Sequence, residues 1–289
     1  MRMPEICKNS NTFFFLLRNC IKVRQMKKII LVLFLLAVNA SFVHAQELDY
    51  ERAYSDYLFK LEQYKSEHGE YVLAMASYLK SKTLTLQTKA EKETLEMLKS
   101  RDDVVATYLT AIRTKLQETS GLGKEEKDEV FLLLDTELKW YLDHKARMNE
   151  GDFLEDLVSK SLEAKTRYEI ESKIAIYKAL FTISKGESKF VRSRQEEILL
   201  EVKNKVEMIK NEGFKETAII ERWFRDIEER FEQSKNLELA AEEVMAKLTP
   251  KERNKDRVYQ SGIGDIEGSL NKLKEVNDFL GEIVREIKR

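Results

Sequence analysis

The part of the chain after residue 45 contains few side chains of the types that bind metals or act as nucleophiles. Its histidines are His68 and His144, and both cysteines, Cys7 and Cys20, come earlier. A di-iron site in a helical bundle needs a Glu three residues before each His, and Lys and Tyr occupy those positions. The zinc motif His-Glu-x-x-His is also absent. We therefore expect no metal site, no disulfide and no covalently held haem.

Glycine and serine patterns do not indicate a cofactor or a covalent mechanism either. The segment 262–268 reads GIGDIEG, in which the last glycine comes one residue too late for the dinucleotide motif G-x-G-x-x-G. Ser77 and Ser269 each begin a Ser-x-x-Lys pattern, but the Lys-Thr-Gly that accompanies it in penicillin-binding proteins does not follow. The sequence predicts no cofactor and no enzymatic activity.

One short motif resembles a known catalytic one. Glu187-Ser188-Lys189-Phe190 is similar to the Glu-Ser-x-Phe motif of lytic transglycosylases, in which the Glu is the general acid. That fold needs a glycine-rich loop further along the chain, whereas 191–210 here reads as an amphipathic helix. Because the resemblance covers four residues, we reject it, and an all-α cell-wall enzyme is the weakest of our expectations.

Residues 26–46 have the three parts of a secretory signal. Lys27 and Lys28 precede the apolar run Ile29–Val38, and Val43-His44-Ala45 offers a cleavage site after Ala45. The run is shorter than the roughly 20 residues that cross a bilayer as a helix. We predict a signal peptide at 26–45, preceded at 1–25 by an upstream extension or a long basic region. The expected location is extracytoplasmic, in a bacterial periplasm, at the cell surface or secreted.

If the signal were not cleaved, the same segment would tether the protein, and we expect no other membrane contact. Without residues 1–45 the chain loses seven Lys or Arg and one Glu, so the rest is acidic by seven charges. An acidic balance argues against nucleic-acid partners, which require a basic face. Pro250 is the only proline after the signal. The composition favours an all-α fold, an elongated antiparallel bundle or coiled coil of six to eight long helices.

The clearest periodicity of the mature region 46–289 lies in residues 47–81. Nine residues recur there at alternating steps of four and three, which places them on one helical stripe. They are Tyr50, Tyr54, Tyr57, Leu61, Tyr64, His68, Tyr71, Met75 and Tyr78. We interpret the stripe as a helix–helix seam, with a recognition surface for glycans or peptides as the alternative. Region 46–118 is expected to be one long helix, or two that meet near Gly69 or within 82–89.

Region 124–248 is predicted to be a helical bundle. The pattern indicates helices at 124–148, from 152 to about 184 with Gly186 as its end, at 187–211, and from about 215 toward 248. Thr249 and Pro250 are typical of a helix start, which predicts a short helix at 250–257 and then a loop at 259–264.

The last predicted element is an amphipathic helix at 264–289 with a heptad repeat. Ile266, Leu273, Leu280 and Ile287 occupy one core position, and Leu270, Asn277 and Val284 occupy the other. A single Asn in such a seam is typical of a dimer whose register it fixes. The interpretation that we prefer is a helix that packs on its own chain.

These patterns predict architecture more firmly than activity. We expect an exported, non-enzymatic scaffold or protein-interaction protein, whose partners are proteins, or a second copy of itself, bound through helical seams. A periplasmic holdase-type chaperone with helical arms is the main alternative.

Overall fold

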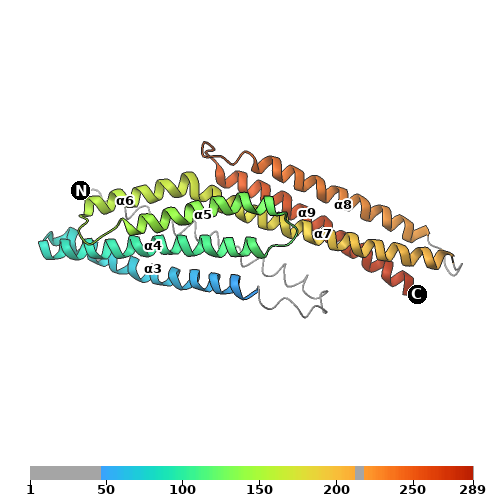
Figure 1. Cartoon of the computed structure of the whole chain (residues 1–289), viewed down its shortest axis with the longest axis horizontal. Coiled ribbons are helices and arrows are strands. Elements are labelled where there is room, and N and C mark those ends of the chain that lie inside the picture. The colour runs from blue at the N-terminus through green and yellow to red at the C-terminus, as the bar shows by residue number, and fades with distance from the viewer. Residues whose placement is uncertain (1–46, 212–217, 289) are drawn as a thin grey trace. The chain divides into compact units, whose positions relative to one another are not determined.

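The computed structural model describes residues 47–211 and 218–288, and every regular element within them is helical (Figure 1). The predicted all-α fold is therefore confirmed. Counting the continuous α6–η2–α7 run as one, the described residues form six helices, which lies within the predicted range. The predicted signal peptide at 26–45 and the segment 1–25 before it lie outside the described residues.

The elements follow one another through short connections. They are α3 (Glu47–Ser81), α4 (Leu84–Glu118), α5 (Lys124–Ala146), α6 (Leu154–Arg167), the π-helical turn η2 (Tyr168–Ser172), α7 (Lys173–Asn211), α8 (Ala218–Met245) and α9 (Lys255–Lys288). None of the helices in these two ranges is both long enough and apolar enough to cross a membrane.

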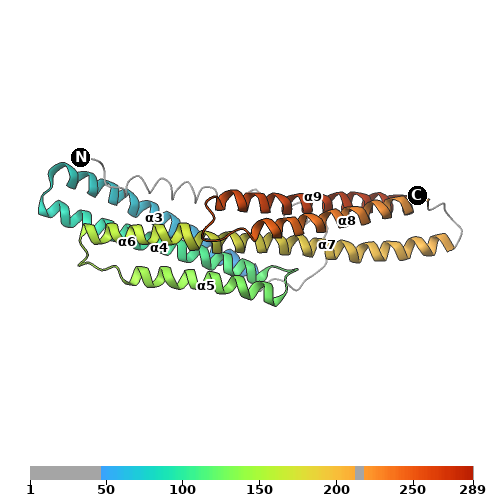
Figure 2. The same cartoon turned by 90° about the horizontal axis from the view of Figure 1, so that it is seen from above.

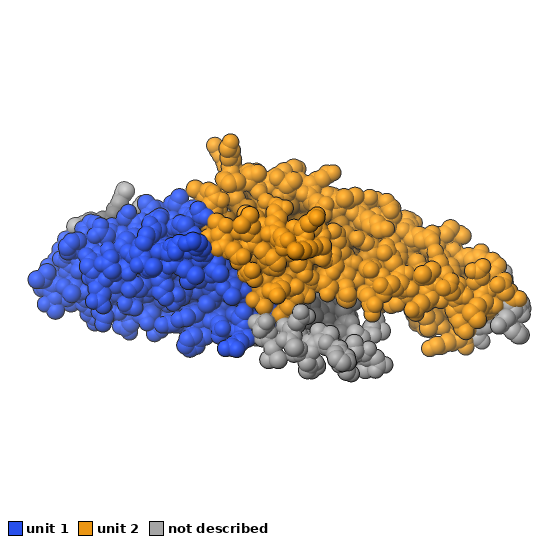
Figure 3. All heavy atoms as spheres, viewed as in Figure 1, with its two compact units in different colours: residues 1–111, 138–167 blue, residues 112–137, 168–289 orange. Residues whose placement is uncertain are grey.

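The chain divides into two compact units (Figure 3). Among the described residues, unit 1 comprises 47–111 and 138–167, and unit 2 comprises 112–137, 168–211 and 218–288. The helices α4 and α5 each contribute residues to both units. Unit 1 is thus built from α3, α6 and parts of α4 and α5, whereas unit 2 contains α7, α8 and α9.

The core of unit 1 is unusually rich in tyrosine. Tyr64, Tyr71 and Tyr141 are among its most deeply buried side chains, together with Leu98 and Leu109. The rings of Tyr57 on α3 and Tyr108 on α4 lie 5.0 Å apart, which packs these two helices against each other. The hydrophobic effect of these large side chains holds the unit together.

The region 47–118 forms two helices, and the break between them lies at Lys82. Lys82 has a φ of 42°, in the left-handed region that ends helices. The Thr83 hydroxyl then accepts a hydrogen bond from the backbone N–H of Leu86 at 3.4 Å and caps α4. Gly69 lies inside α3. The two helices therefore meet within the expected segment 82–89 and not near Gly69.

The predicted helix end at Gly186 is wrong. The helix α7 continues through it to Asn211, and Gly186 is buried against the connection between α4 and α5. A Cβ atom there would lie 2.6 Å from Cγ of Leu122 and 2.7 Å from Cγ2 of Thr119. The glycine is needed for a close approach between segments and does not end the helix.

The predicted loop at 259–264 and short helix at 250–257 are also wrong. The helix α9 begins at Lys255 and passes through Gly262 and Gly264. A Cβ atom on Gly262 would lie 2.7 Å from Cγ of Met245 on α8. Gly262 therefore permits α8 and α9 to approach closely and does not mark a loop.

In unit 2, α7, α8 and α9 lie side by side in both views of the molecule (Figure 2). Two hydrophobic clusters fill their interior. One contains Leu199, Val206, Ile220, Ile227, Phe231, Leu273, Val276, Leu280 and Ile283. The other contains Ile174, Phe181, Ala241, Met245, Leu248 and Ile266.

Glu126 links the start of α5 to α7 within unit 2. Its Oε1 atom lies 2.7 Å from Nζ of Lys185 and 3.0 Å from Nζ of Lys189. Burial opposes ionisation of the carboxyl. Hydrogen bonds from Lys185, from the backbone N–H of Gly123 and from Lys189 outweigh it and lower the pKa of Glu126 from 4.5 to about 2.

This pKa predicts a loss of stability in acid. A group whose pKa is lower in the folded state stabilises the fold fully above its unfolded pKa, and that contribution is lost as the pH falls through the folded pKa. Between about pH 4.5 and 2, the stability of the wild type is expected to fall toward that of Glu126→Gln. Urea unfolding of both proteins across this range measures the difference, and a difference that does not change with pH would contradict the assignment.

Candidate functional site

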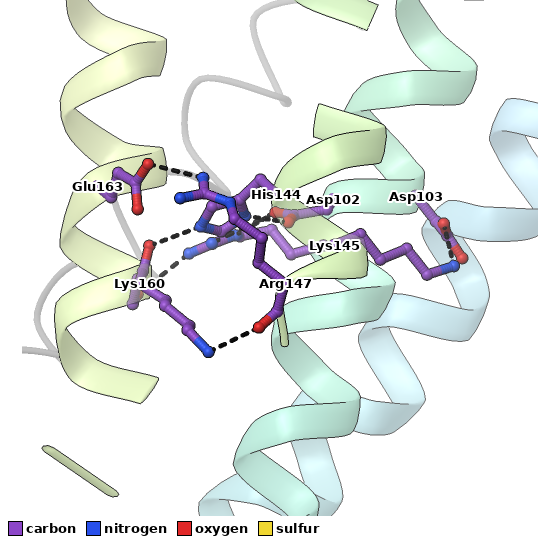
Figure 4. A network of polar contacts seen from close by, with 9 residues as sticks. Asp102, Asp103, His144, Lys145, Arg147, Lys160 and Glu163 are labelled. Carbon is purple, nitrogen blue, oxygen red and sulfur yellow. Dashed lines mark hydrogen bonds and ion pairs between the residues drawn. The ribbon is translucent and has the colours of Figure 1, made fainter. Parts of the chain in front are cut away.

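A network of polar side chains in unit 1 surrounds His144, and we call it the His144 centre (Figure 4). His144 and Asp102 have no solvent exposure. The Nδ1 atom of His144 lies 2.5 Å from Oδ2 of Asp102, and Nε2 lies 3.1 Å from the backbone oxygen of Lys160. The pair thus connects α4, α5 and α6.

Both ring nitrogens of His144 and both carboxyl oxygens of Asp102 have partners. A carbonyl oxygen only accepts hydrogen bonds, so Nε2 of His144 donates to the backbone oxygen of Lys160. Arg101 lies 3.3 Å from Oδ1 of Asp102, the oxygen that does not contact His144. The pair therefore forms a closed set of contacts among the three helices.

Charged side chains extend this centre toward the surface. Lys145 Nζ lies 2.6 Å from Asp103, which also meets Lys60 at 3.4 Å. On the other side Arg147 pairs with Glu163 at 2.7 Å. The ring of Trp140 stacks on His144 at 4.8 Å. Because His144 and Asp102 are closed off and already bonded, the centre has the properties of a structural tie between helices.

The second histidine lies apart from this centre. The His68 ring lies between those of Tyr64 and Tyr71, with both centroid distances 5.9 Å. Burial lowers the pKa of His68, so this side chain is neutral at pH 7. Among the residues that the structure describes, no group of three or more His, Cys, Asp and Glu side chains is arranged to hold a metal ion.

The predicted tyrosine stripe lies on the inner side of α3. Tyr57, Leu61, Tyr64, Tyr71 and Met75 are buried. The remaining members, Tyr50, Tyr54, His68 and Tyr78, are partly buried. The stripe is therefore directed toward the interior of unit 1, and its buried members are inaccessible to a glycan or a peptide.

The C-terminal heptad needs one correction. Ile266, Leu273 and Leu280 are buried, and Ile287 is partly buried. The second core position is occupied by the buried residues Ser269, Val276 and Ile283. Of the predicted residues, Leu270 is partly buried and packs against both hydrophobic clusters, Asn277 is partly buried, and Val284 is exposed. The second core position lies one residue earlier than predicted because α9 packs against both α7 and α8. Asn277 therefore lies at the edge of the seam.

Sequence reasoning missed a buried polar layer in unit 2. Ser188, Ser234 and Ser269, one from each of α7, α8 and α9, are fully buried. Ser269 Oγ lies 3.0 Å from Ser188 Oγ and 2.8 Å from Ser234 Oγ. Ser188 also donates to Glu238 at 2.7 Å, and Glu238 pairs with Arg192 at 2.7 Å. The predicted heptad left Ser269 outside its core positions, so the pattern of α9 gave no signal of this layer. Buried polar layers of this kind fix helix register.

The residues of the Glu-Ser-x-Phe motif point into different surroundings. Burial raises the pKa of Glu187, and Lys115, whose Nζ lies 3.7 Å away, opposes that rise. Ser188 belongs to the buried serine layer, and Phe190 is exposed. A raised pKa is a property of a general acid, but Glu187 already faces a cation of its own chain.

The outer side of α3 carries an exposed apolar surface that the sequence reasoning also missed. It is formed by Leu58, Phe59, Val72, Leu73 and Leu79, of which Phe59 is 69% and Leu73 is 64% exposed. The small residues Ser66, Gly69 and Ala76 lie between and beside them. The sequence signal was that Phe59 and Leu73, which are two heptads apart, lie on the side of the helix away from the tyrosine stripe. We call this set the α3 outer face.

The chain matches no protein-family model, no curated protein and no solved structure in the comparisons made. Its function is therefore argued from the geometry above. Two features carry that argument, the closed His144 centre and the open α3 outer face.

Proposed function

We propose that this protein is an exported, non-enzymatic helical scaffold that binds a partner protein through the α3 outer face. The observation that carries the proposal is the row of exposed apolar side chains along one side of one helix. Large apolar side chains that stay exposed together on one helix of a protein often mark an interaction site. An enzyme would require accessible polar groups, and those of the His144 centre are bonded to one another.

The way in which α3 is anchored suits this role. Its inner side is fixed by Tyr57, Tyr64 and Tyr71 in the core of unit 1. A helix held on one side and exposed on the other presents its apolar residues with little loss of conformational freedom on binding. Recognition of one helix by another or by a groove uses apolar residues that lie on one side of the helix. The predicted signal peptide supports a partner outside the cytoplasm.

The proposal is tested by site-specific cross-linking in cells. A photoreactive phenylalanine analogue replaces Phe59 or, in a second variant, Leu73. Leu200 on α7, which is 62% exposed and belongs to unit 2, serves as the matched control. We expect a discrete cross-linked product from positions 59 and 73 and none from position 200. Equal yields from all three positions, or none from any, would contradict the proposal.

A holdase-type chaperone is the second candidate. It is supported by further exposed apolar side chains on other helices, among them Leu84, Leu132, Leu200 and Leu239. A holdase needs such surface in many places, whereas a specific scaffold needs only the α3 outer face. An aggregation-suppression assay with an unfolding client separates the two. The scaffold predicts no suppression at a stoichiometric ratio.

A further inference from the structure

We infer that the partner bound by the α3 outer face is a second copy of this chain, whose α3 packs antiparallel to the first. The inference deepens the proposed function and rests on it. A two-fold interface must be self-complementary. If residue i of one chain contacts residue j of the copy, then residue j of the first chain contacts residue i of the copy. Three properties of the α3 outer face meet this requirement.

The first property is the placement of the large apolar residues. They form two adjacent pairs, Leu58–Phe59 and Val72–Leu73, which lie two heptads apart on the same side of α3. The two pairs are equally far from a point between Lys65 and Ser66. A two-fold axis at that point places the first pair of each chain against the second pair of the other.

The second property is the distribution of charge. Glu51 and Lys80 are exposed and are equally far from the same point, so the axis brings each against the opposite charge of the copy. Glu62 and Lys65 form an ion pair within one chain and lie near the axis, where Lys65 also comes close to Lys65 of the copy. A parallel pairing would place Glu51 against Glu51 and Lys80 against Lys80, which is repulsive. The outer charges, Glu51 and Lys80, therefore favour the antiparallel arrangement.

The third property is the small residues close to the axis. Ser66 and Gly69 lie there, and a Cβ atom added to Gly69 would meet nothing within 4 Å. Small residues allow two helices to approach closely. The large apolar pairs on each side then come into contact across the seam.

Cysteine cross-linking tests the arrangement directly. The protein is expressed with its own N-terminal segment in a Cys7→Ser/Cys20→Ser background and purified as the cell processes it. The antiparallel pairing predicts rapid disulfide-linked dimers from Ser66→Cys, which lies next to the axis. It predicts none from Ser55→Cys alone or Ala76→Cys alone, but efficient linkage from an equimolar mixture of the two. Linkage from Ser55→Cys alone would show a parallel pair and overturn the inference.

Charge exchange supplies an independent test by sedimentation equilibrium. Glu51→Lys and Lys80→Glu are each expected to weaken the dimer about tenfold, because two attractive pairs become repulsive. The double variant Glu51→Lys/Lys80→Glu restores wild-type dimerisation if the pairing is antiparallel. Leu73→Glu is expected to weaken it by about a hundredfold or more with unchanged helicity.

A monomeric wild type would overturn the inference. If position 59 then still cross-links to another protein in cells, the proposed function stands and only the self-pairing fails. If position 59 cross-links to nothing, both fail.

Discussion

His144→Ala is expected to lower the free energy of unfolding by about 3–5 kcal/mol. The substitution leaves Oδ2 of Asp102 buried without its partner, although Arg101 still contacts Oδ1, and it leaves the Lys160 carbonyl without its donor. Each buried acceptor that loses its partner costs about 1–3 kcal/mol. The cavity left under Trp140 adds to the loss.

Asp143→Ala is the matched control for this prediction. Asp143 is the neighbouring residue on α5, and it is exposed and paired with Lys139. Its removal is expected to change stability by no more than about 0.5 kcal/mol. Urea unfolding of both variants and of His144→Ala/Asp102→Ala completes the test. The double variant should lose less than the sum of the single ones, and equal effects of His144→Ala and Asp143→Ala would refute the role of the pair.

Gly121→Ala is expected to destabilise unit 2 by about 2–5 kcal/mol. Gly121 has a φ of +80°, which costs a residue with a Cβ atom roughly 1–2 kcal/mol. That atom would also lie 2.3 Å from the carbonyl oxygen of Gly186 and 2.8 Å from the backbone nitrogen of Phe190. Both are backbone atoms that cannot move aside, and overpacking of this kind costs about 1–3 kcal/mol.

Gly123→Ala separates these causes from a general effect on the turn. Gly123 lies in the same connection, and a Cβ atom there meets only Oε2 of Glu126 at 3.6 Å. We expect a change within about 0.5 kcal/mol. Thermal unfolding followed by circular dichroism compares the two. The account of the close approach fails if both variants melt at the same temperature.

The local features of the fold were predictable because they depend on neighbours in the chain. The tyrosine stripe at 47–81 has the same limits as α3, and the break at Lys82 falls within the predicted region. Acidic residues at the start of α5 indicated its beginning at Lys124. Helical periodicity determines such features without knowledge of what the helix packs against.

The features that failed depend on residues far apart in the sequence. Glycine is common at helix ends, but Gly186 and Gly262 lie inside helices, where each allows a close approach to another segment. The second core position of α9 is set by α7 and α8 together, and no pattern within α9 contains that information. The pairing of His144 with Asp102 joins residues on different helices, so nothing in the local sequence could have shown it.

The role of the α3 outer face is tested most directly by its accessibility in the cell. Phe59→Cys and Leu200→Cys are each made in the cysteine-free background and labelled with a membrane-permeant maleimide, in intact cells and in dilute purified protein. If α3 binds a partner, Phe59→Cys reacts much more slowly in cells than when purified and dilute, whereas Leu200→Cys reacts at similar rates in both. Equal labelling of Phe59→Cys in the two conditions would contradict the proposed interaction surface.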